Sequence, residues 1–163
     1  MDLWRRLAGR SELPPGFAGG LADTERVLGS AAMADGRRVV VTTHGLWVPE
    51  GEGHRRIGWH LVSNARWDGR SLHLTEAEEV GAQGQTVLLA DRPPRRIPLS
   101  GPGPVPDLVR QRVTRSVLAS QRREFPGGSA LFIRRRVPGR DGVQQQVRPD
   151  AGTDLDDVRR VLG

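Results

Sequence analysis

The chain has 163 residues and a formal net charge of +6, and arginine supplies all 25 of its basic residues. A chain of this length suits one domain with a core and is too short for two ordinary ones. Without cysteine, disulfides, thiolate zinc sites and a cysteine nucleophile are excluded. No stretch approaches the ~20 apolar residues of a membrane span, and the N-terminus lacks the ~7–15-residue apolar run of a signal peptide. We expect a cytoplasmic protein that is not transmembrane.

The first 20 residues are predicted to form an N-terminal extension and linker. Leu3, Trp4 and Leu7 have helical spacing, so this segment could dock on its own domain or on a membrane surface. Residues 13–20 contain two prolines and three glycines, which cannot continue a helix. The globular part is therefore expected to begin near residue 21.

Period-two patterns and turn residues predict antiparallel strands over residues 26–76. We expect a strand at 26–32, for which a short helix is the rival interpretation, a turn at Asp35-Gly36 and a strand at 38–48. Gly45 within that second strand suggests a bulge or a close backbone approach. Residues 49–53 form a charged turn, and the strands at 55–66 and 70–76 follow.

These last two strands are predicted to pair around Asp68-Gly69, a dipeptide that favours a two-residue turn. In this register Trp67 faces Arg70, and alternation assigns each side chain to one face. The predicted core face carries Leu61, Ser63, Ala65, Trp67, Leu72 and Leu74. The opposite face carries Val62, Asn64, Arg66, Ser71, His73 and Thr75.

A helix is the most prominent element in the second half of the sequence. It is predicted from Asp107, a plausible N-cap, to about residue 124, with Val109, Val113 and Val117 as its apolar stripe. A polar loop at 78–85, a strand at 86–90 and an extended segment at 96–99 come before it. A hairpin of residues 130–137 and 143–148 and a short helix at 154–162 come after it.

The segments ERVL, VVVTTHGLWV, RRIGWHLVSNARW and SLHLTE, followed by one helix, resemble the bacterial pleckstrin-homology-like pattern over residues 25–124. The whole chain is also similar to small uncharacterised actinobacterial proteins with TTHGLWV-like and RRVPGRDG-like segments. The resemblance implies an α+β fold of mostly antiparallel strands, a PH-like partly open barrel closed by one C-terminal helix, with an extra hairpin after it. The implied division is 1–20, 21–125 and 126–163, the last packed on the same domain.

Catalytic and metal-binding signatures are missing from the sequence. The four histidines, His44, His54, His60 and His73, form neither H-x-x-x-H nor HExxH, so no metal site is predicted. No nucleophile elbow, P-loop or dinucleotide-binding fingerprint is present, so no cofactor and no catalytic residue is predicted.

Arginine offers the best polar candidates for a site, because its planar guanidinium matches phosphate with two parallel hydrogen bonds. Two of these arginines, Arg134 and Arg136, share one face of a strand. The candidates for binding an anion or phosphate are Arg134, Arg136, Arg140, Arg148, Arg92, Arg95 and Arg96. Trp47 and Trp59 are the candidates for contact with a protein partner.

These patterns leave three hypotheses for function. The first is a non-enzymatic binding module that recognises a protein partner through a sheet edge or its tryptophans, if these are exposed. The second is binding of nucleic acid or anionic lipid head groups by arginine, although codon bias also explains the arginine excess. The third is a small hydrolase or transferase without a recognisable motif.

Overall fold

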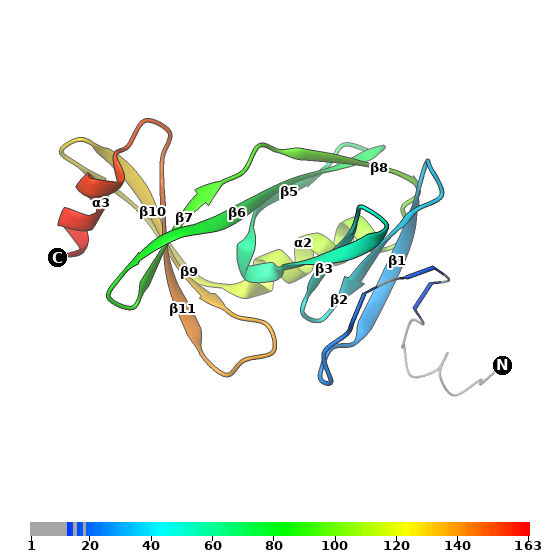
Figure 1. Ribbon diagram of the computed structural model, residues 1–163. Helices are drawn as coiled ribbons and strands as arrows, with labels where there is room; N and C mark the ends of the chain where they lie inside the picture. The colour runs from blue at the N-terminus through cyan, green and yellow to red at the C-terminus, as the bar shows by residue number, and fades with distance from the viewer. Residues whose placement is uncertain (1–12, 15, 18) are drawn as a thin grey trace.

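The computed structural model describes residues 13–14, 16–17 and 19–163 (Figure 1). The predicted N-terminal segment with Leu3, Trp4 and Leu7 lies outside the described residues. The described chain is mostly antiparallel sheet with two α-helices, which confirms the coarse α+β expectation. The strands are β1 (Val27–Met33), β2 (Arg38–Thr42), β3 (Gly45–Glu50), β4 (Gly53–Gly58), β5 (Val62–Trp67), β6 (Ser71–Gln83), β7 (Thr86–Asp91), β8 (Arg95–Gly101), β9 (Val117–Phe125), β10 (Gly128–Arg136) and β11 (Val143–Pro149). The helices are the 3-10 helix η1 (Trp59–Leu61), α2 (Val105–Ser116) and α3 (Leu155–Leu162).

Hydrogen bonding joins these strands in the order β4-β3-β2-β1-β8-β6-β7-β11-β10-β9, and β5 pairs with β6. Neighbouring strands are antiparallel except β7 and β11, which are parallel. Because β4 and β9 end this order without pairing with each other, the sheet is open. Strand β6 links the two halves of the molecule: residues 71–76 pair with β5 and β8, and residues 77–83 pair with β7 (Figure 1).

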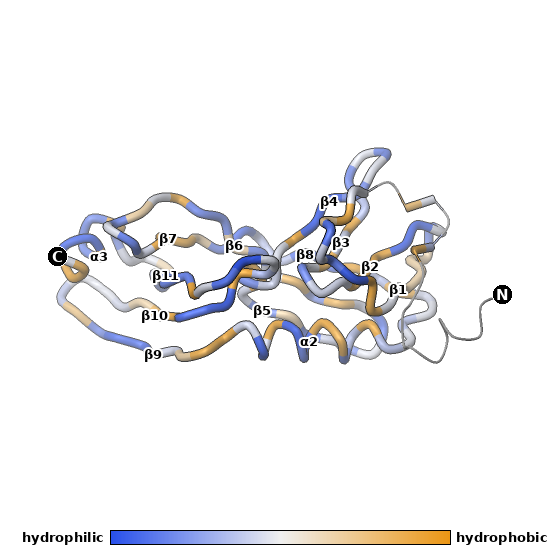
Figure 2. The backbone as a smooth tube through the Cα atoms, turned by 90° about the horizontal axis from the view of Figure 1, so that it is seen from below, coloured by the Kyte–Doolittle hydropathy of each residue, from blue (hydrophilic) through white to orange (hydrophobic). Residues whose placement is uncertain are grey.

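Each half has its own apolar cluster. The larger cluster lies where α2 packs against β1, β2 and β5, and its buried members include Val105 and Val109 of the helix. Figure 2 shows apolar and polar residues alternating along α2, as expected for a helix with one buried face. The smaller cluster lies between α3 and the strands β7, β10 and β11, around Leu88, Val147 and Val158.

The predicted hairpin turn at Asp68-Gly69 is longer than two residues. Trp67 pairs with Leu72, and the Asp68 carboxylate accepts from the amides of Arg70 and Ser71 at 2.8 and 2.7 Å. The register therefore differs by two residues from the predicted one. A shift of two leaves Ala65, Trp67, Leu72 and Leu74 on one face, and Leu72 and Leu74 are buried as predicted. Ser71, which was assigned to the opposite face, is also buried.

Two predicted strands are interrupted in the structure, and one predicted loop is part of a strand. The strand at 38–48 is the hairpin of β2 and β3, since the Thr42 hydroxyl accepts from the amides of His44 and Gly45. The strand at 55–66 is interrupted by η1, where Trp59 turns inward. A bulge after η1 then buries Val62 instead of exposing it. The predicted loop at 78–85 is mostly the second part of β6.

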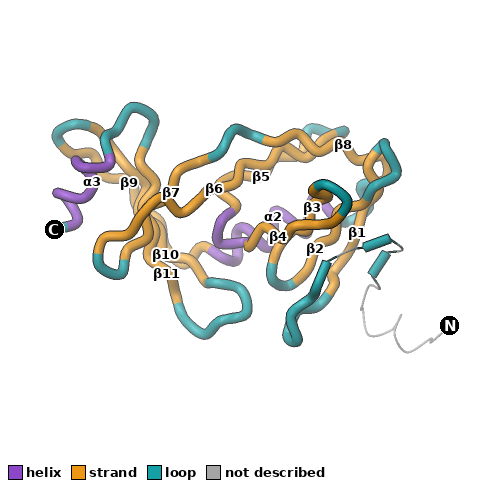
Figure 3. The backbone as a smooth tube through the Cα atoms, viewed as in Figure 1, coloured by secondary structure: helices purple, strands orange, loops and turns teal. Residues whose placement is uncertain are grey.

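The long helix predicted from Asp107 is the largest error in the expected fold. Helix α2 begins at Val105 and ends at Ser116, and the next residues form β9 (Figure 3). Phe125 pairs directly with Gly128, so Pro126-Gly127 is a hairpin turn rather than a helix stop. Pairing along the whole of β10 decides the conformation of β9.

A buried carboxylate joins the start of β1 to the strands β2, β3 and β4. The side chain of Glu25 accepts from the hydroxyl of Thr42 at 2.5 Å, from Nε1 of Trp47 at 2.9 Å and from the amide of Ala22 at 3.0 Å. It also pairs with Arg56. Burial alone would raise the pKa of Glu25, but these hydrogen bonds and the charge of Arg56 hold it below its usual value.

Substituting Glu25→Gln is expected to lower the free energy of unfolding by about 2 kcal/mol, because Gln has one acceptor oxygen and would leave some of the buried donors, such as Nε1 of Trp47, without an acceptor. Urea unfolding at neutral pH measures the change. Since the folded-state pKa of Glu25 is lowered, its contribution is present above the unfolded value and is lost as the pH falls through the folded one. The exposed Glu79→Gln is the control and should change stability by less than about 0.5 kcal/mol. Equal effects of the two substitutions would contradict this role for Glu25.

Candidate functional site

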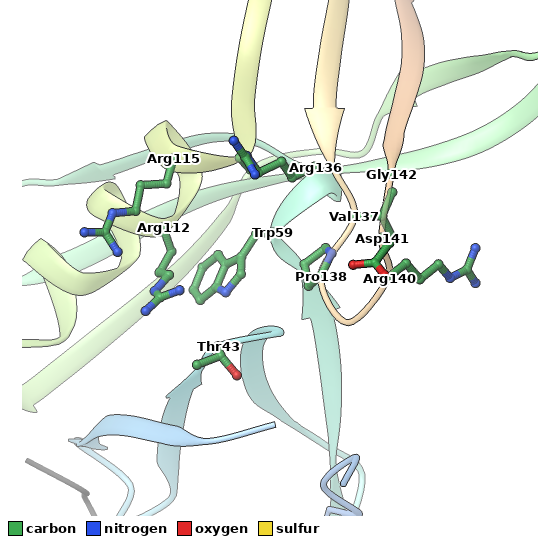
Figure 4. Close-up of a pocket in the computed structure, with 11 residues that line it drawn as sticks. Thr43, Trp59, Arg112, Arg115, Arg136, Val137, Pro138, Arg140, Asp141 and Gly142 are labelled. Carbon is green, nitrogen blue, oxygen red and sulfur yellow. The ribbon is translucent and has the colours of Figure 1, made fainter. Parts of the chain in front are cut away.

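A hollow lies where α2 ends and the turn between β10 and β11 approaches the bend between β2 and β3 (Figure 4). Its volume is about 270 Å³. We call it the arginine groove, because four guanidinium side chains border it. Its lining residues are Thr43, Trp59, Arg112, Arg115, Ser116, Arg136, Val137, Pro138, Arg140, Asp141 and Gly142.

The guanidinium groups come from two elements that are far apart in sequence. Arg112 and Arg115 belong to the last turns of α2, and Arg136 ends β10. Figure 4 shows Arg112 beside the indole of Trp59 and Arg136 extending from β10 toward the junction of α2 and β9, whereas Arg140 points away from the indole. The groove therefore presents cations from the helix and from the sheet to one opening.

These cations are not paired with acidic side chains of the described residues. In the described part of the chain, Arg112, Arg115, Arg136 and Arg140 make no ion pair with a carboxylate. Burial, followed by the charges of Arg115 and Arg26, lowers the pKa of Arg112 below its usual value. Positive charge thus accumulates at the groove, where Asp141 is the one carboxylate among the lining residues.

A further cation lies directly behind the groove wall. Arg135 is 3% exposed and donates to the hydroxyl of Ser116 from Nη2 at 2.6 Å and from Nε at 3.0 Å. Its Nη1 donates to the carbonyl of Val62 at 2.9 Å. Burial, followed by the charge of Arg148, lowers its pKa to about 10. No carboxylate of the described chain pairs with Arg135, so its charge is stabilised by neutral acceptors alone.

The turn between β10 and β11, which borders the groove, packs against His44 in the other half of the molecule. Gly139 has a φ of +75°, and a Cβ at this position would lie 2.7 Å from Cε1 of His44. His44 is itself buried and lies within hydrogen-bonding distance of the hydroxyl of Thr24, at 3.3 Å. A side chain at Gly139 would therefore push the turn away from the bend between β2 and β3.

The structure separates the arginines that the sequence grouped as anion-binding candidates. Arg136 and Arg140 line the arginine groove. Arg134 borders a different hollow, on the face of β7, β9, β10 and β11. Arg148 instead contacts Asp91, with 3.7 Å between Nη1 and Oδ1.

The three candidates near the start of β8 are not part of the groove. Arg92 pairs with Glu78, with 3.2 Å between Nη2 and Oε2. Nε of Arg96 donates to the hydroxyl of Ser71 at 3.1 Å, and Arg95 is exposed on β8. None of these three side chains lines the groove with Arg136.

Both tryptophans that were expected to contact a partner are core residues, which corrects that prediction. Trp47 is 6% exposed, and its ring packs edge-on against Phe17. Trp59 is 2% exposed, and its Nε1 donates to the carbonyl of Thr42 at 3.0 Å. Their hydrogen bonds to buried acceptors explain why these large rings turn inward.

Sequence reasoning missed Arg112 and Arg115 as site residues. Their spacing of three places them on one face of a helix, which was the available signal. Nothing in the sequence reveals that this face meets the turn after β10, because that contact depends on where α2 ends and β9 begins.

Comparison of the chain with family models, curated proteins and solved structures finds no match. Among the described residues, no group of three or more histidine, aspartate or glutamate side chains could hold a metal ion. No helix in the described part is long and apolar enough to cross a membrane.

The field of the groove should be measurable at His60. Burial, followed by the charges of Arg135 and Arg140, lowers the pKa of His60 to about 4. The variant Arg140→Gln should raise this pKa while leaving it below the usual 6.5, because burial is the larger cause. NMR titration of the ring protons checks this, with Arg70→Gln, in the turn before β6, as the control. An unchanged His60 pKa in Arg140→Gln would contradict the assignment.

The same shift predicts how stability depends on pH. Because the folded-state pKa of His60 lies below that of the unfolded chain, the unfolded state binds the proton more readily between pH 6.5 and about 4. The free energy of unfolding should therefore fall as the pH decreases through this window. Replacing His60 with Gln should remove that part of the dependence in urea unfolding at several pH values.

Proposed function

We propose that this protein is a non-enzymatic binding module whose arginine groove holds an anionic group of its ligand. The observation that carries the proposal is a set of cations that form no ion pair with a carboxylate of the described residues: Arg112, Arg115 and Arg136 at the groove, with Arg135 behind it. An anion in the groove would supply a counter-charge that no ion pair of residues 13–14, 16–17 and 19–163 provides.

The groove is suited to one small anionic group, such as a phosphate or a carboxylate. Its volume of about 270 Å³ lies below the ~300–1,000 Å³ usual for larger organic ligands. Guanidinium groups bind phosphate and carboxylate oxygens in pairs, and the hydroxyl of Thr43 at the rim adds a neutral donor. Asp141, the one carboxylate in the lining, would disfavour an anion that extends toward the turn.

Binding is favoured over catalysis and over stacking of nucleic-acid bases. His60, with its strongly lowered pKa, does not line the groove, so no titratable pair is set against the arginines. Trp59, the aromatic residue of the lining, is 2% exposed and cannot stack on a base. The hydrolase or transferase hypothesis therefore has no support from the groove.

We also propose that strands β1–β6 and β8 and helix α2 form a PH-like unit. Support comes from the antiparallel run β1–β4, the second group β5, β6 and β8, and the helix α2 that packs against β1, β2 and β5. Strands β7 and β9–β11 and helix α3 are additions to such a unit. Fold alone does not determine a ligand, so the groove and not this likeness carries the proposed function.

A protein partner remains a second candidate, and one observation favours it. Strand β9 ends the sheet order, and its outer edge pairs with no other strand of the described chain. Such edges can accept an added strand from another molecule.

Titration with sodium pyrophosphate at low ionic strength tests the groove. Saturable binding is expected by calorimetry, and Arg112→Gln and Arg136→Gln should each weaken it by about tenfold, the loss of a hydrogen bond to a charged group. Binding should also weaken as salt is added.

The matched control is Arg70→Gln, which removes the same charge from the turn before β6. It should leave the affinity nearly unchanged. Absence of binding to the wild-type protein, or an equal loss in all three variants, would overturn the proposed function.

A further inference from the structure

Strand β9 is an unusually accessible edge. It has nine residues, and residues 117–124 are all exposed. It contains neither proline nor glycine, and it pairs only with β10 among the described strands. Its exposed apolar side chains include Val117 and Leu118, at 37% and 41%. The ladder with β10 has one bulge, at Leu118, and is regular from Ala119 to Phe125. A long edge of this kind is a template for another strand.

The edge leads into the arginine groove. Val117 is opposite Arg135 in the ladder, and Arg115 lies two residues before it in α2. Arg136 follows Arg135 at the end of β10. A strand added along β9 would therefore have one end beside the cations of the groove.

Charge along the edge favours an acidic occupant. Arg123 lies on β9, where its guanidinium covers the ring of Phe132, and Arg134 is exposed on the neighbouring strand. Arg122 contributes less, because it already pairs with Asp150. Basic side chains on β9 and β10 would repel a second copy of the same edge and would attract carboxylates.

We infer that an extended acidic peptide segment of a partner protein adds a strand to β9 and places an acidic group in the arginine groove. The inference rests on the proposed function, since it assigns the anion to a peptide. Backbone hydrogen bonds along β9 supply affinity, and the cations select acidic side chains. The register of the peptide on β9 is fixed at the end beside the groove, because one peptide carboxylate must reach Arg136.

The probe is a nine-residue peptide of alternating glutamate and valine, labelled for fluorescence anisotropy at low ionic strength. Pairing with an edge uses every second amide of the added strand. Two derivatives, N-methylated at the odd or at the even positions, should therefore differ: one loses binding by at least about tenfold and the other keeps it. Hydrogen exchange of β9 amides should slow when the parent peptide binds.

The results with pyrophosphate and with the peptides distinguish this inference from the proposed function. Pyrophosphate binding together with two N-methylated derivatives that bind as well as the parent would overturn strand addition and leave the groove intact. Failure of both probes would overturn the proposed function and this inference together. Equal binding of a lysine–valine peptide, or binding of an oligothymidylate but not of the glutamate peptide, would contradict an acidic peptide partner. Loss of peptide binding in Arg136→Gln, with Arg70→Gln unaffected, would support it.

Discussion

The buried guanidinium of Arg135 is the interaction on which the joint between the two halves depends. It extends from β10 to the hydroxyl that ends α2 and to the carbonyl that begins β5, so one side chain connects three elements. Gln146 makes a parallel connection from β11, donating to the carbonyl of His60 at 2.9 Å. Because Arg135 has no carboxylate partner in the described chain, this joint retains a positive charge in a buried position.

The charge of Arg135 adds to the positive charge of the arginine groove. Ser116 separates Arg135 from the opening, and Arg112 and Arg136 add cations at the rim. A protein that used these arginines only for solubility would not need to direct them to one hollow from α2 and β10. An anion bound there would interact with several fixed charges in a partly dehydrated site, where each interaction is stronger than in water. Fold stability and ligand affinity would then depend on the same charges.

Local patterns in the sequence were sufficient to predict elements that pack against segments close to them in the chain. The hairpin of β10 and β11 and helix α3 occur as predicted, and Asp154 caps that helix by accepting from the amide of Asp156 at 2.8 Å. The helix predicted for residues 117–125 was wrong because their composition permits either helix or strand. Pairing with β10 decides in favour of a strand. The groove could not be predicted for the same reason: Arg112 and Arg136 line one hollow only because α2 ends at Ser116.

The most direct test of the central claim is a crystal structure of the protein soaked in tungstate, a phosphate-like anion with a strong anomalous signal. The account predicts an anomalous peak in the arginine groove, within hydrogen-bonding reach of Arg112 and Arg136. Peaks confined to other arginines, such as Arg70 or Arg95, with an unoccupied groove would contradict it.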